Sequence, residues 1–427
     1  KMKLIEMILS SENVIKAQSR VISNKGCAGI DGMHVDALVE YMRTNWMGIK
    51  ESILARKYKP APVRRVEIPK PNGGVRKLGI PTVLDRTIQQ AIVQVLSPIF
   101  ENEFQEHSYG FRPCRSCEQA VLKFLDYLNE GYEWIVDIDL EKFFDKVPQD
   151  KLMSYVGRVI CDPDTESLIC KYLKSGVMEN GIYEATDEGT PQGGNLSPLL
   201  SNVMLNELDK ELVSRGLRYV RYADDCIIAV CSEASAKRVM RSVTTWIERE
   251  LGLKVNASKS HICRPTKLKY LGFGFYRNPQ TKEWQSRPHE SSVSKLVRSL
   301  KKLCKRSWSI SITDRITRLN YVIRGWINYF SISFMKLKMD KIDEHLRTML
   351  RKVIWKQWKT PQKRAWGLRK LGVDSALARR TSFCGNRYEW VVRRTCVARA
   401  ISKDVFTRRG LVSCLDYYLI RHSLKTN

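Results

Sequence analysis

Two adjacent aspartates between two apolar, β-prone runs constrain the fold of this chain most strongly. The segment RYVRYADDCIIAV, residues 218–230, carries Asp224 and Asp225 where the chain must turn. β-Branched and aromatic residues favour strands and Asp favours turns, so the segment predicts a hairpin with both carboxylates at its tip. Both carboxylates can then converge with an acid from a neighbouring strand.

Two earlier segments supply that acid and its surroundings. WIVDIDLEKFF, residues 134–144, predicts an apolar strand with Asp137 and Asp139, and GTPQGGNLSPLLSNVMLNEL, residues 189–208, predicts a Gly-rich loop leading into a helix. Clustered carboxylates offer hard oxygen ligands, which suit Mg²⁺ rather than zinc or copper. Two such ions about 3.5 to 4 Å apart would activate a 3′-hydroxyl and stabilise a leaving pyrophosphate. The alternative is that the two tip aspartates are ordinary turn residues.

The flanking regions predict a hairpin before this core and basic helices after it. Residues 64–82, RRVEIPKPNGGVRKLGIPT, alternate apolar and charged positions around a Pro-Asn-Gly-Gly turn, and residues 87–100 repeat apolar side chains at helical spacing. Three basic amphipathic helices are expected at residues 292–308, 316–330 and 342–358. The Thr-Pro-Gln sequence that follows ends the last of them.

The positive charge is concentrated in the last third of the chain. The whole chain has 73 Lys and Arg against 45 Asp and Glu, a net charge of +28. Residues 1–285 contain 40 basic and 36 acidic side chains, whereas residues 286–427 contain 33 and 9, a net charge of +24. Such a field attracts polyanions, either nucleic acid or an anionic membrane surface. The ten Trp and 17 Tyr include platforms for base stacking, which favours nucleic acid.

Composition excludes general disorder and a membrane span. Hydrophobic residues make up 43% of the chain and aromatic residues 9%, as in globular proteins. No apolar run approaches the roughly 18 to 20 residues that span a bilayer, and residues 1–10 lack a signal-peptide core, so a soluble intracellular protein is expected. The twelve Cys lack the spacing of a disulfide framework, and the pair Cys114 and Cys117 lacks a partner pair at zinc spacing, so free thiols are expected.

Eight segments in one order resemble a known family, the reverse transcriptases encoded by group II introns, also called maturases. They are IPKPNGGVRKLGIPT, HSYGFRPCRSCEQA, IVDIDLEKFFD, GTPQGGNLSPLLSN, RYADD, LGLKVNASKS, YLGFGF and RGWINYF. Retrons and the enzymes of diversity-generating retroelements share blocks similar to RYADD, but RGWINYF and the basic last third resemble the intron-encoded branch. The compact length is similar to group IIC members that lack an endonuclease domain.

The resemblance implies an α+β right-hand polymerase. Its parts would be fingers, a palm made of an antiparallel sheet backed by helices, an α-helical thumb and a basic helical C-terminal module. The expected bounds are residues 1–100 for the N-terminal extension and fingers, and 101–285 for the palm with fingers-associated insertions. Residues 286–360 would form the three-helix thumb, the maturase X domain of the family, and residues 361–427 the basic module that binds DNA or RNA.

The resemblance also implies the metal site. Asp139, Asp224 and Asp225 match the metal-binding acids of the family, and the backbone carbonyl of Ile138 is a further candidate ligand. Strand periodicity alone cannot choose between Asp137 and Asp139, because both would point to one face. The family's spacing, with an aromatic residue five positions after the catalytic acid, selects Asp139.

The nucleotide site carried over from the family contains Lys70, Arg76, Ile138, Phe144, Gln192, Gly193 and Ala223. Phe144 would exclude a 2′-hydroxyl, although core packing explains most aromatic side chains on strands. The glycine would let the backbone approach the substrate. The two cations at the hairpin turn would hold the triphosphate, although a solvated hairpin tip is the simpler explanation without the resemblance.

Two further features carry over. Lys259 resembles the family lysine that protonates the leaving pyrophosphate as a general acid, with Lys254 as the competing candidate. The primer grip, a hairpin that braces the end of the primer, would comprise Tyr270, Leu271, Gly272 and Phe273, although alternating aromatics also suit a purely structural hairpin.

The function implied is that of an RNA-directed DNA polymerase that binds its intron RNA and assists splicing and retrohoming. It would use two Mg²⁺ ions, with Mn²⁺ as a substitute, and its partners would be intron RNA, an RNA template with a DNA primer, target DNA and dNTPs, with no membrane. A bacterial cytoplasmic location is expected. The oligomeric state is left open, with a homodimer as one possibility. A pure RNA-binding splicing factor would not need the acids, and an RNA-synthesising polymerase would need a small or polar residue at Phe144.

Overall fold

The computed structural model describes residues 3–69, 73–179, 181–190 and 193–426. The chain divides into two compact units, Lys1–Arg264 and Pro265–Asn427. The first unit contains 36 basic and 35 acidic side chains, a net charge of +1, and the second contains 37 and 10, a net charge of +27. The concentration of positive charge is therefore a property of the second unit. The four expected domain bounds stay a prediction.

The N-terminal helices pack against one long helix. Helices α1 (Leu4–Ile8), α2 (Ser11–Ser23) and α3 (Leu38–Leu54) lie near α4 (Val83–Glu101), with α1 and α2 in direct contact with it. The hydroxyl of Thr82 accepts a hydrogen bond from the Asp85 amide at 3.1 Å and begins α4 four residues before the expected start at residue 87.

The first sheet contains the expected fingers hairpin. Strands β1 (Val63–Pro69) and β2 (Val75–Ile80) pair antiparallel, with Arg64 opposite Ile80, which confirms the hairpin. The turn residues 70–72 lie outside the described residues. Strands β4 (Val177–Glu179) and β5 (Ile182–Glu184) extend the sheet in the order β2-β1-β4-β5, and β1 pairs parallel with β4.

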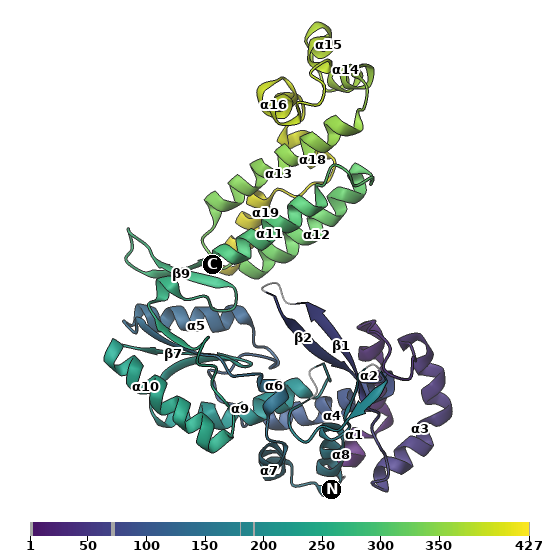
Figure 1. Cartoon of the computed structure of the whole chain (residues 1–427), viewed down its shortest axis with the longest axis vertical. Coiled ribbons are helices and arrows are strands. Elements are labelled where there is room, and N and C mark those ends of the chain that lie inside the picture. Colours follow the sequence, from purple (N-terminus) through teal and green to yellow (C-terminus); the bar gives the residue numbers. More distant parts are fainter. Residues whose placement is uncertain (1–2, 70–72, 180, 191–192, 427) are drawn as a thin grey trace. The chain divides into compact units, whose positions relative to one another are not determined.

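The second sheet is the palm, and it is antiparallel throughout. Its order is β6-β7-β3-β8, from the strands β3 (Trp134–Ile138), β6 (Arg218–Tyr222), β7 (Asp225–Val230) and β8 (His261–Cys263). Helix α9 (Ser197–Ser214) contacts β6, and α10 (Glu233–Trp246) contacts β3, β7 and β8 (Figure 1). The expected antiparallel sheet backed by helices is confirmed. The other helices of this unit are α5 (Cys117–Asn129), α6 (Phe143–Lys146), α7 (Gln149–Ile160) and α8 (Pro163–Leu173).

The strand expected over residues 134–144 is shorter than predicted. Strand β3 ends at Ile138, Lys142 has a φ of +45°, and α6 then carries Phe143 and Phe144. Leu140 and Phe143 are both buried, and a straight strand cannot point residues three apart to the same face. The chain therefore turns after Ile138, and Phe144 lies on a short helix.

The second unit consists of a hairpin and helices. Strands β9 (Phe273–Arg277) and β10 (Trp284–Pro288) form the hairpin, and the long helices are α11 (Glu290–Leu303), α12 (Ile312–Phe330) and α13 (Lys336–Gln357). These three confirm the three expected basic helices, although α11 ends before the expected residue 308 and α13 begins before the expected residue 342. The remaining helices are α14 (Pro361–Lys370), α15 (Ser375–Ser382), α16 (Tyr388–Arg394), α17 (Val397–Ala400), α18 (Lys403–Arg408) and α19 (Cys414–Thr426).

The last helix belongs to the thumb bundle. In Figure 1, α19 lies alongside α12 and α13, and it contacts both. The carboxylate of Asp343 on α13 accepts hydrogen bonds from the amides of Cys414 and Leu415 at 2.7 and 3.0 Å, at the start of α19. Tyr418 is buried, and its hydroxyl donates to the Ser333 carbonyl at 2.9 Å. The last helix thus packs into the same core as α12 and α13.

Across the described ranges, no helix is long and apolar enough to cross a membrane. All twelve cysteines are free thiols.

Candidate active site

Strand register brings the expected acids together at one end of the palm sheet. Ile138, the last residue of β3, lies opposite Cys226 of β7, so Asp139 follows at the level of Asp225. Asp225 pairs with Tyr222 across a two-residue turn. That turn contains Ala223 and Asp224, so the expected hairpin is confirmed, but only one of the two carboxylates lies in its turn, because Asp225 is the first residue of β7.

Desolvation and neighbouring carboxylates raise the pKa values of Asp224 and Asp225. Desolvation is the largest cause of the raised pKa of Asp225, about 6, and the charges of Asp224, Asp137 and Asp139 add to it. The pKa of Asp224 is also raised, mainly by desolvation and then by Asp139. The acids therefore lie close enough to disfavour one another's ionised forms.

A loop between η2 (Ile247–Leu251) and β8 holds Asp139 in place. The Asp139 amide donates to the Ser260 hydroxyl at 3.0 Å, and the Asp139 carbonyl accepts from the Asn256 amide at 2.8 Å. Nζ of Lys259 lies 3.2 Å from one carboxylate oxygen of Asp139 and 3.3 Å from the other. Lys254 is exposed, and its carbonyl accepts from the backbone amide of Glu141. Of the two competing lysines, Lys259 is the one paired with a site acid.

Asp137 has different neighbours from Asp139. It lies within β3, opposite His261 of β8, and the two side chains approach to 3.8 Å. Desolvation raises the pKa of Asp137 to about 6, and the nearby His261 partly offsets this rise. Asp137 therefore faces the next strand while Asp139 lies beyond the strand's end, a distinction that strand periodicity alone did not make.

The carboxylate side chains of these acids are suitable ligands for a divalent cation. Carboxylate oxygens are the preferred ligands of Mg²⁺, and a cation would relieve the repulsion that helps to raise the pKa values of Asp224 and Asp225. Among the residues that the structure describes, however, no three His, Cys, Asp or Glu side chains converge closely enough to hold a metal ion. Asp139 is paired with Lys259 at the same end of the sheet.

Phe144 is anchored between the core and the Gly-rich loop. It is half-buried, and its ring centroid lies 5.2 Å from that of the buried Phe143. Its carbonyl accepts a hydrogen bond from the Thr190 amide at 2.7 Å. A Cβ at Gly189 would lie 2.8 Å from the same carbonyl, so this contact requires glycine. Phe144 therefore keeps one side on the core and leaves part of its ring exposed.

Gly193 approaches the protein's own backbone. Its φ is +124°, and a Cβ there would lie 2.5 Å from the carbonyl oxygen of Gly79 on β2. The sequence predicted that glycine would allow a substrate to approach, but the close approach that the structure describes is between the loop and the fingers strand. Gln192, the preceding residue, lies outside the described residues.

The other expected nucleotide contacts are partly placed. Arg76 is exposed on β2, and its charge lowers the pKa of Asp224, which indicates proximity. Ile138 and Ala223 are buried, so only their backbone atoms are suited to a ligand. Lys70 lies outside the described residues.

The proposed primer grip is a tight turn in the second unit. Tyr270 and Phe273 exchange backbone hydrogen bonds of 3.0 and 2.8 Å around Leu271 and Gly272, which have φ values of +49° and +83°. The Leu271 carbonyl accepts from the Tyr329 hydroxyl at 2.9 Å. Both carbonyls of the turn are occupied, because that of Gly272 accepts from the Ser292 hydroxyl at 2.8 Å.

Ser260 and Asn256 were missed by sequence reasoning, although both hold the backbone of Asp139. Both lie in the quoted segment LGLKVNASKS, where only the lysines were considered. Asn and Ser commonly bond to nearby backbone groups in turns, and this was the signal available.

Comparisons with known proteins agree with this geometry. Residues 68–275 match the family model described as reverse transcriptase (RNA-dependent DNA polymerase), and residues 293–372 match the model described as group II intron, maturase-specific domain. Protein YkfC of Escherichia coli is 33% identical over 313 residues, which cover 64% of this chain and 81% of that protein. The group II intron-encoded protein LtrA of Lactococcus lactis is 37% identical over 53% of this chain and 37% of its own length. The putative COX1/OXI3 intron 2 protein of Saccharomyces cerevisiae is 28% identical over 67% of this chain and 39% of its own length.

The palm with its acid turn and the two matched domains define a reverse transcriptase that carries a maturase domain. The chain belongs to the family of reverse transcriptases encoded by group II introns, which assist the splicing of their introns. The α+β right-hand fold expected from the sequence is confirmed. The chain spans most of YkfC but less than two fifths of LtrA and of the yeast intron protein.

Proposed function

We propose that Asp139, Asp224 and Asp225 form the centre of RNA-templated DNA synthesis. Their position at one end of the palm sheet, with pKa values of Asp224 and Asp225 that neighbouring carboxylates help to raise, carries the proposal. Two Mg²⁺ ions, for which Mn²⁺ can substitute, would activate the primer 3′-hydroxyl and stabilise the leaving pyrophosphate when bound. The Ile138 carbonyl is a further candidate ligand at the same strand end.

Lys259 is the proposed general acid. Its side chain is 62% exposed and its ammonium lies against Asp139, so a substrate oxygen at the acids would be within its reach. The ammonium gives a proton to the departing pyrophosphate oxygen, which avoids expelling a more highly charged leaving group.

Phe144 and the fingers cations would select and hold the nucleotide. The half-buried ring of Phe144 is a rigid wall against C2′ of the sugar, because Phe143 and the Thr190 amide hold it. Arg76 would bind the triphosphate with its planar fork, and Lys70 would add a point charge. Gln192, Gly193 and Ala223 would complete the pocket, with Tyr270 to Phe273 bracing the primer.

The second unit would bind intron RNA and target DNA. Its net charge is +27, and it contains a pocket of about 490 Å³ with cationic and aromatic walls. There the Arg306 guanidinium lies 4.2 Å from the centre of the Tyr388 ring, and Trp390 is 50% exposed. Glu389 also lines the pocket and is paired with Lys352. Cations next to exposed rings suit a nucleic-acid backbone and its stacked bases.

Retrohoming into target DNA follows from the same combination of polymerase and RNA binding. The free thiols and the bacterial relatives support a location in the cytoplasm of a bacterium.

The test is extension of oligo(dT) on poly(rA) with Mg²⁺, with two matched variants. Asp139→Asn should abolish extension, because it removes a site carboxylate without changing side-chain size. Asp137→Asn is the control, since that residue faces His261 on the next strand, and it should retain most of the activity. The proposal is wrong if Asp139→Asn extends the primer like the unmodified chain, or if the two substitutions exchange these effects.

A further inference from the structure

Arg221 is a fully buried charge directly before the acid turn. It lies on β6, its side chain is 0% exposed, and it forms a two-pronged ion pair with Asp209 on α9, which is also 0% exposed. The two contacts measure 2.5 Å from Nη2 and 2.8 Å from Nε. A buried pair of this kind is weak as a source of stability, because desolvation offsets the attraction between the charges. Its place beside the turn calls for a different explanation.

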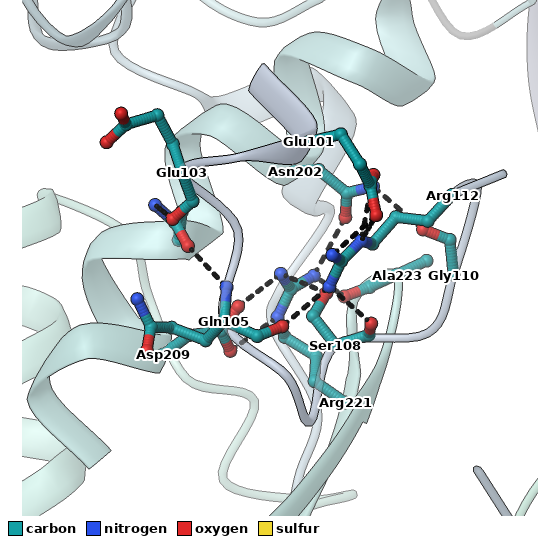
Figure 2. A network of polar contacts seen from close by, with 11 residues as sticks. Glu101, Glu103, Gln105, Ser108, Gly110, Arg112, Asn202, Asp209, Arg221 and Ala223 are labelled. Atoms are coloured by element: carbon teal, nitrogen blue, oxygen red, sulfur yellow. Dashed lines mark hydrogen bonds and ion pairs between the residues drawn. The ribbon is translucent and has the colours of Figure 1, made fainter. Parts of the chain in front are cut away.

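A further donor of Arg221 reaches the turn itself (Figure 2). Nη1 donates to the Ala223 carbonyl at 2.8 Å and to the Asn202 side-chain oxygen at 3.0 Å. Ala223 has a φ of +59°, a left-handed conformation that disfavours a residue with a Cβ. The guanidinium therefore fixes the peptide group that joins Ala223 to Asp224.

The opposite side of the turn is closed by the loop at residues 105–112. This loop runs beside β6, with the Tyr109 amide donating to the Arg221 carbonyl at 2.9 Å. A Cβ at Gly110 would lie 2.3 Å from the Ala223 amide nitrogen, so the two backbones are in direct contact. Asn202 joins the two sides, because its amide donates to the Gly110 carbonyl at 2.7 Å while its oxygen accepts from Arg221.

The loop is itself anchored by a second arginine. Arg112 is almost fully buried and pairs with Glu101 at 2.6 Å. It also donates to the carbonyls of Gln105 and Ser108 at 2.6 and 2.9 Å, and the Ser108 hydroxyl accepts from Arg221 at 2.8 Å (Figure 2). Three segments that resemble separate family blocks, HSYGFRP, SPLLSN and RYADD, thus meet at one buried guanidinium.

We propose that Arg221, oriented by Asp209, is a positioning residue for DNA synthesis. It touches neither substrate nor metal, and it acts by holding the Ala223 carbonyl so that the next residue presents its carboxylate in one orientation. The inference rests on the proposed role of Asp224 as a metal ligand. A residue that serves only folding would affect stability without changing the affinity of the acids for a cation.

The decisive variant removes both buried charges together. Arg221→Met alone would leave the Asp209 carboxylate buried and unpaired and could prevent folding. Arg221→Met combined with Asp209→Leu replaces the ion pair with apolar side chains of similar volume, a change that folded proteins often tolerate. The double variant should fold but unfold at a moderately lower temperature than the unmodified chain, because it loses the bond to Ala223 and the donors to Asn202 and Ser108. Its affinity for Mn²⁺ alone, measured by electron paramagnetic resonance, should fall about 10- to 100-fold, and kcat on a pre-annealed primer-template should fall similarly. The dissociation constant for the primer-template should not change.

Two single substitutions complete the design. Asn202→Ala leaves the ion pair intact but breaks the bridge to Gly110, so it should reduce Mn²⁺ affinity by a smaller factor, and it decides the question if the double variant does not fold. Asp85→Asn is the matched control, because Asp85 is a buried acid of the same unit that accepts hydrogen bonds from Tyr58 and Thr82. It should lower the unfolding temperature without changing Mn²⁺ affinity.

The outcomes separate this inference from the proposed site. A folded double variant, or a folded Asn202→Ala variant, with unchanged Mn²⁺ affinity and kcat overturns the positioning role. If Asp224→Asn binds Mn²⁺ and extends primers like the unmodified chain, the proposed site itself is wrong. If Asp224→Asn is inactive while the double variant behaves like the unmodified chain, only the positioning role is lost.

Discussion

Nζ of Lys259 lies 3.2 Å from Oδ1 of Asp139, although the two residues are 120 positions apart in the sequence. The lysine side chain is 62% exposed and the aspartate side chain 32%, so the pair is open to solvent on one side. An ammonium in this position balances the carboxylate and can also reach a substrate phosphate. The pairing supports Lys259 over Lys254 as the general acid.

Lys259→Met should lower kcat for single-nucleotide incorporation by about 100-fold, the typical contribution of one general acid. Affinity for the primer-template should not change, because the substitution removes a proton donor and not a binding surface. Lys254→Met is the matched control, since Lys254 is exposed nearby on the same loop. Equal losses in the two variants would show that positive charge in this loop, and not a proton donor at Lys259, is what matters.

Asp225→Asn should stabilise the metal-free protein at pH 7.5 but not at pH 4. The raised pKa of Asp225, about 6, means that the folded state favours the protonated form. Its contribution to stability is therefore present below its unfolded pKa of about 4 and is lost as pH rises through 6. The gain from Asn should be no more than about 1 kcal/mol, because part of the Asp225 residue is open to water, which screens its charge.

Thermal unfolding in the presence of a chelator, from pH 4 to pH 8, measures this difference. Adding Mg²⁺ at pH 7.5 should then stabilise the unmodified chain more than the variant. A variant that is less stable than the unmodified chain at pH 7.5 without metal would contradict the assignment.

Phe144→Val should reduce discrimination against ribonucleotides by about 10-fold or more, because a smaller side chain leaves room for the 2′-hydroxyl. The measurement compares kcat/KM for rNTP and dNTP. Phe143→Leu is the control: Phe143 is 2% exposed, so its truncation should lower the free energy of unfolding by roughly 1 to 3 kcal/mol without changing sugar preference. A change in selectivity with Phe143→Leu alone would move the sugar contact to that ring.

RNA affinity should depend strongly on salt through the second unit. Arg306→Gln should reduce the slope of log K against log[salt] by about 0.7 to 0.9, the value for one phosphate contact, whereas Trp390→Ala should weaken binding without changing the slope. Lys237→Gln on α10 of the first unit is the matched control and should change neither. An identical slope for Arg306→Gln would remove this pocket from the RNA interface.

Truncation is a poor test of the same interface. Ending the chain after residue 360 would remove α19, which packs against α12 and α13 and buries Tyr418. Lost binding could then reflect an unfolded thumb, so single substitutions on the surface are the better experiment.

Local sequence patterns predicted the elements of the palm well. The hairpin with Ala223 and Asp224 at its tip follows from two β-prone runs and a turn, and all of that information lies within 13 residues. The thumb helices follow from the apolar stripe, and Leu296 and Leu300 of α11 are buried as the spacing requires. Where neighbouring residues determine the structure, the prediction succeeds.

Contacts between distant segments could not be predicted in the same way. An arginine within an apolar strand gives no sign that Asp209 on α9, the helix that precedes and contacts β6, will neutralise it, because the pairing depends on tertiary packing. The contact of Gly193 with Gly79 joins residues 114 positions apart, and strand alternation did not reveal that β3 ends before Asp139. The sequence could suggest which residues carry the chemistry, but not which ones hold them in position.

The most direct test of the whole account measures two properties of one variant, Asp224→Asn. The account assigns chemistry to the acids of the first unit and RNA affinity to the second unit, with its net charge of +27. Primer extension should therefore fall by about 1,000-fold or more, because loss of one carboxylate disrupts the proposed metal site. The dissociation constant for intron RNA, measured on the same preparation, should stay within about two-fold of the unmodified value. Many contacts between basic side chains and RNA phosphates supply the affinity, so the loss of one carboxylate should change it little. Extension at the unmodified rate, or loss of RNA binding together with extension, would contradict the account.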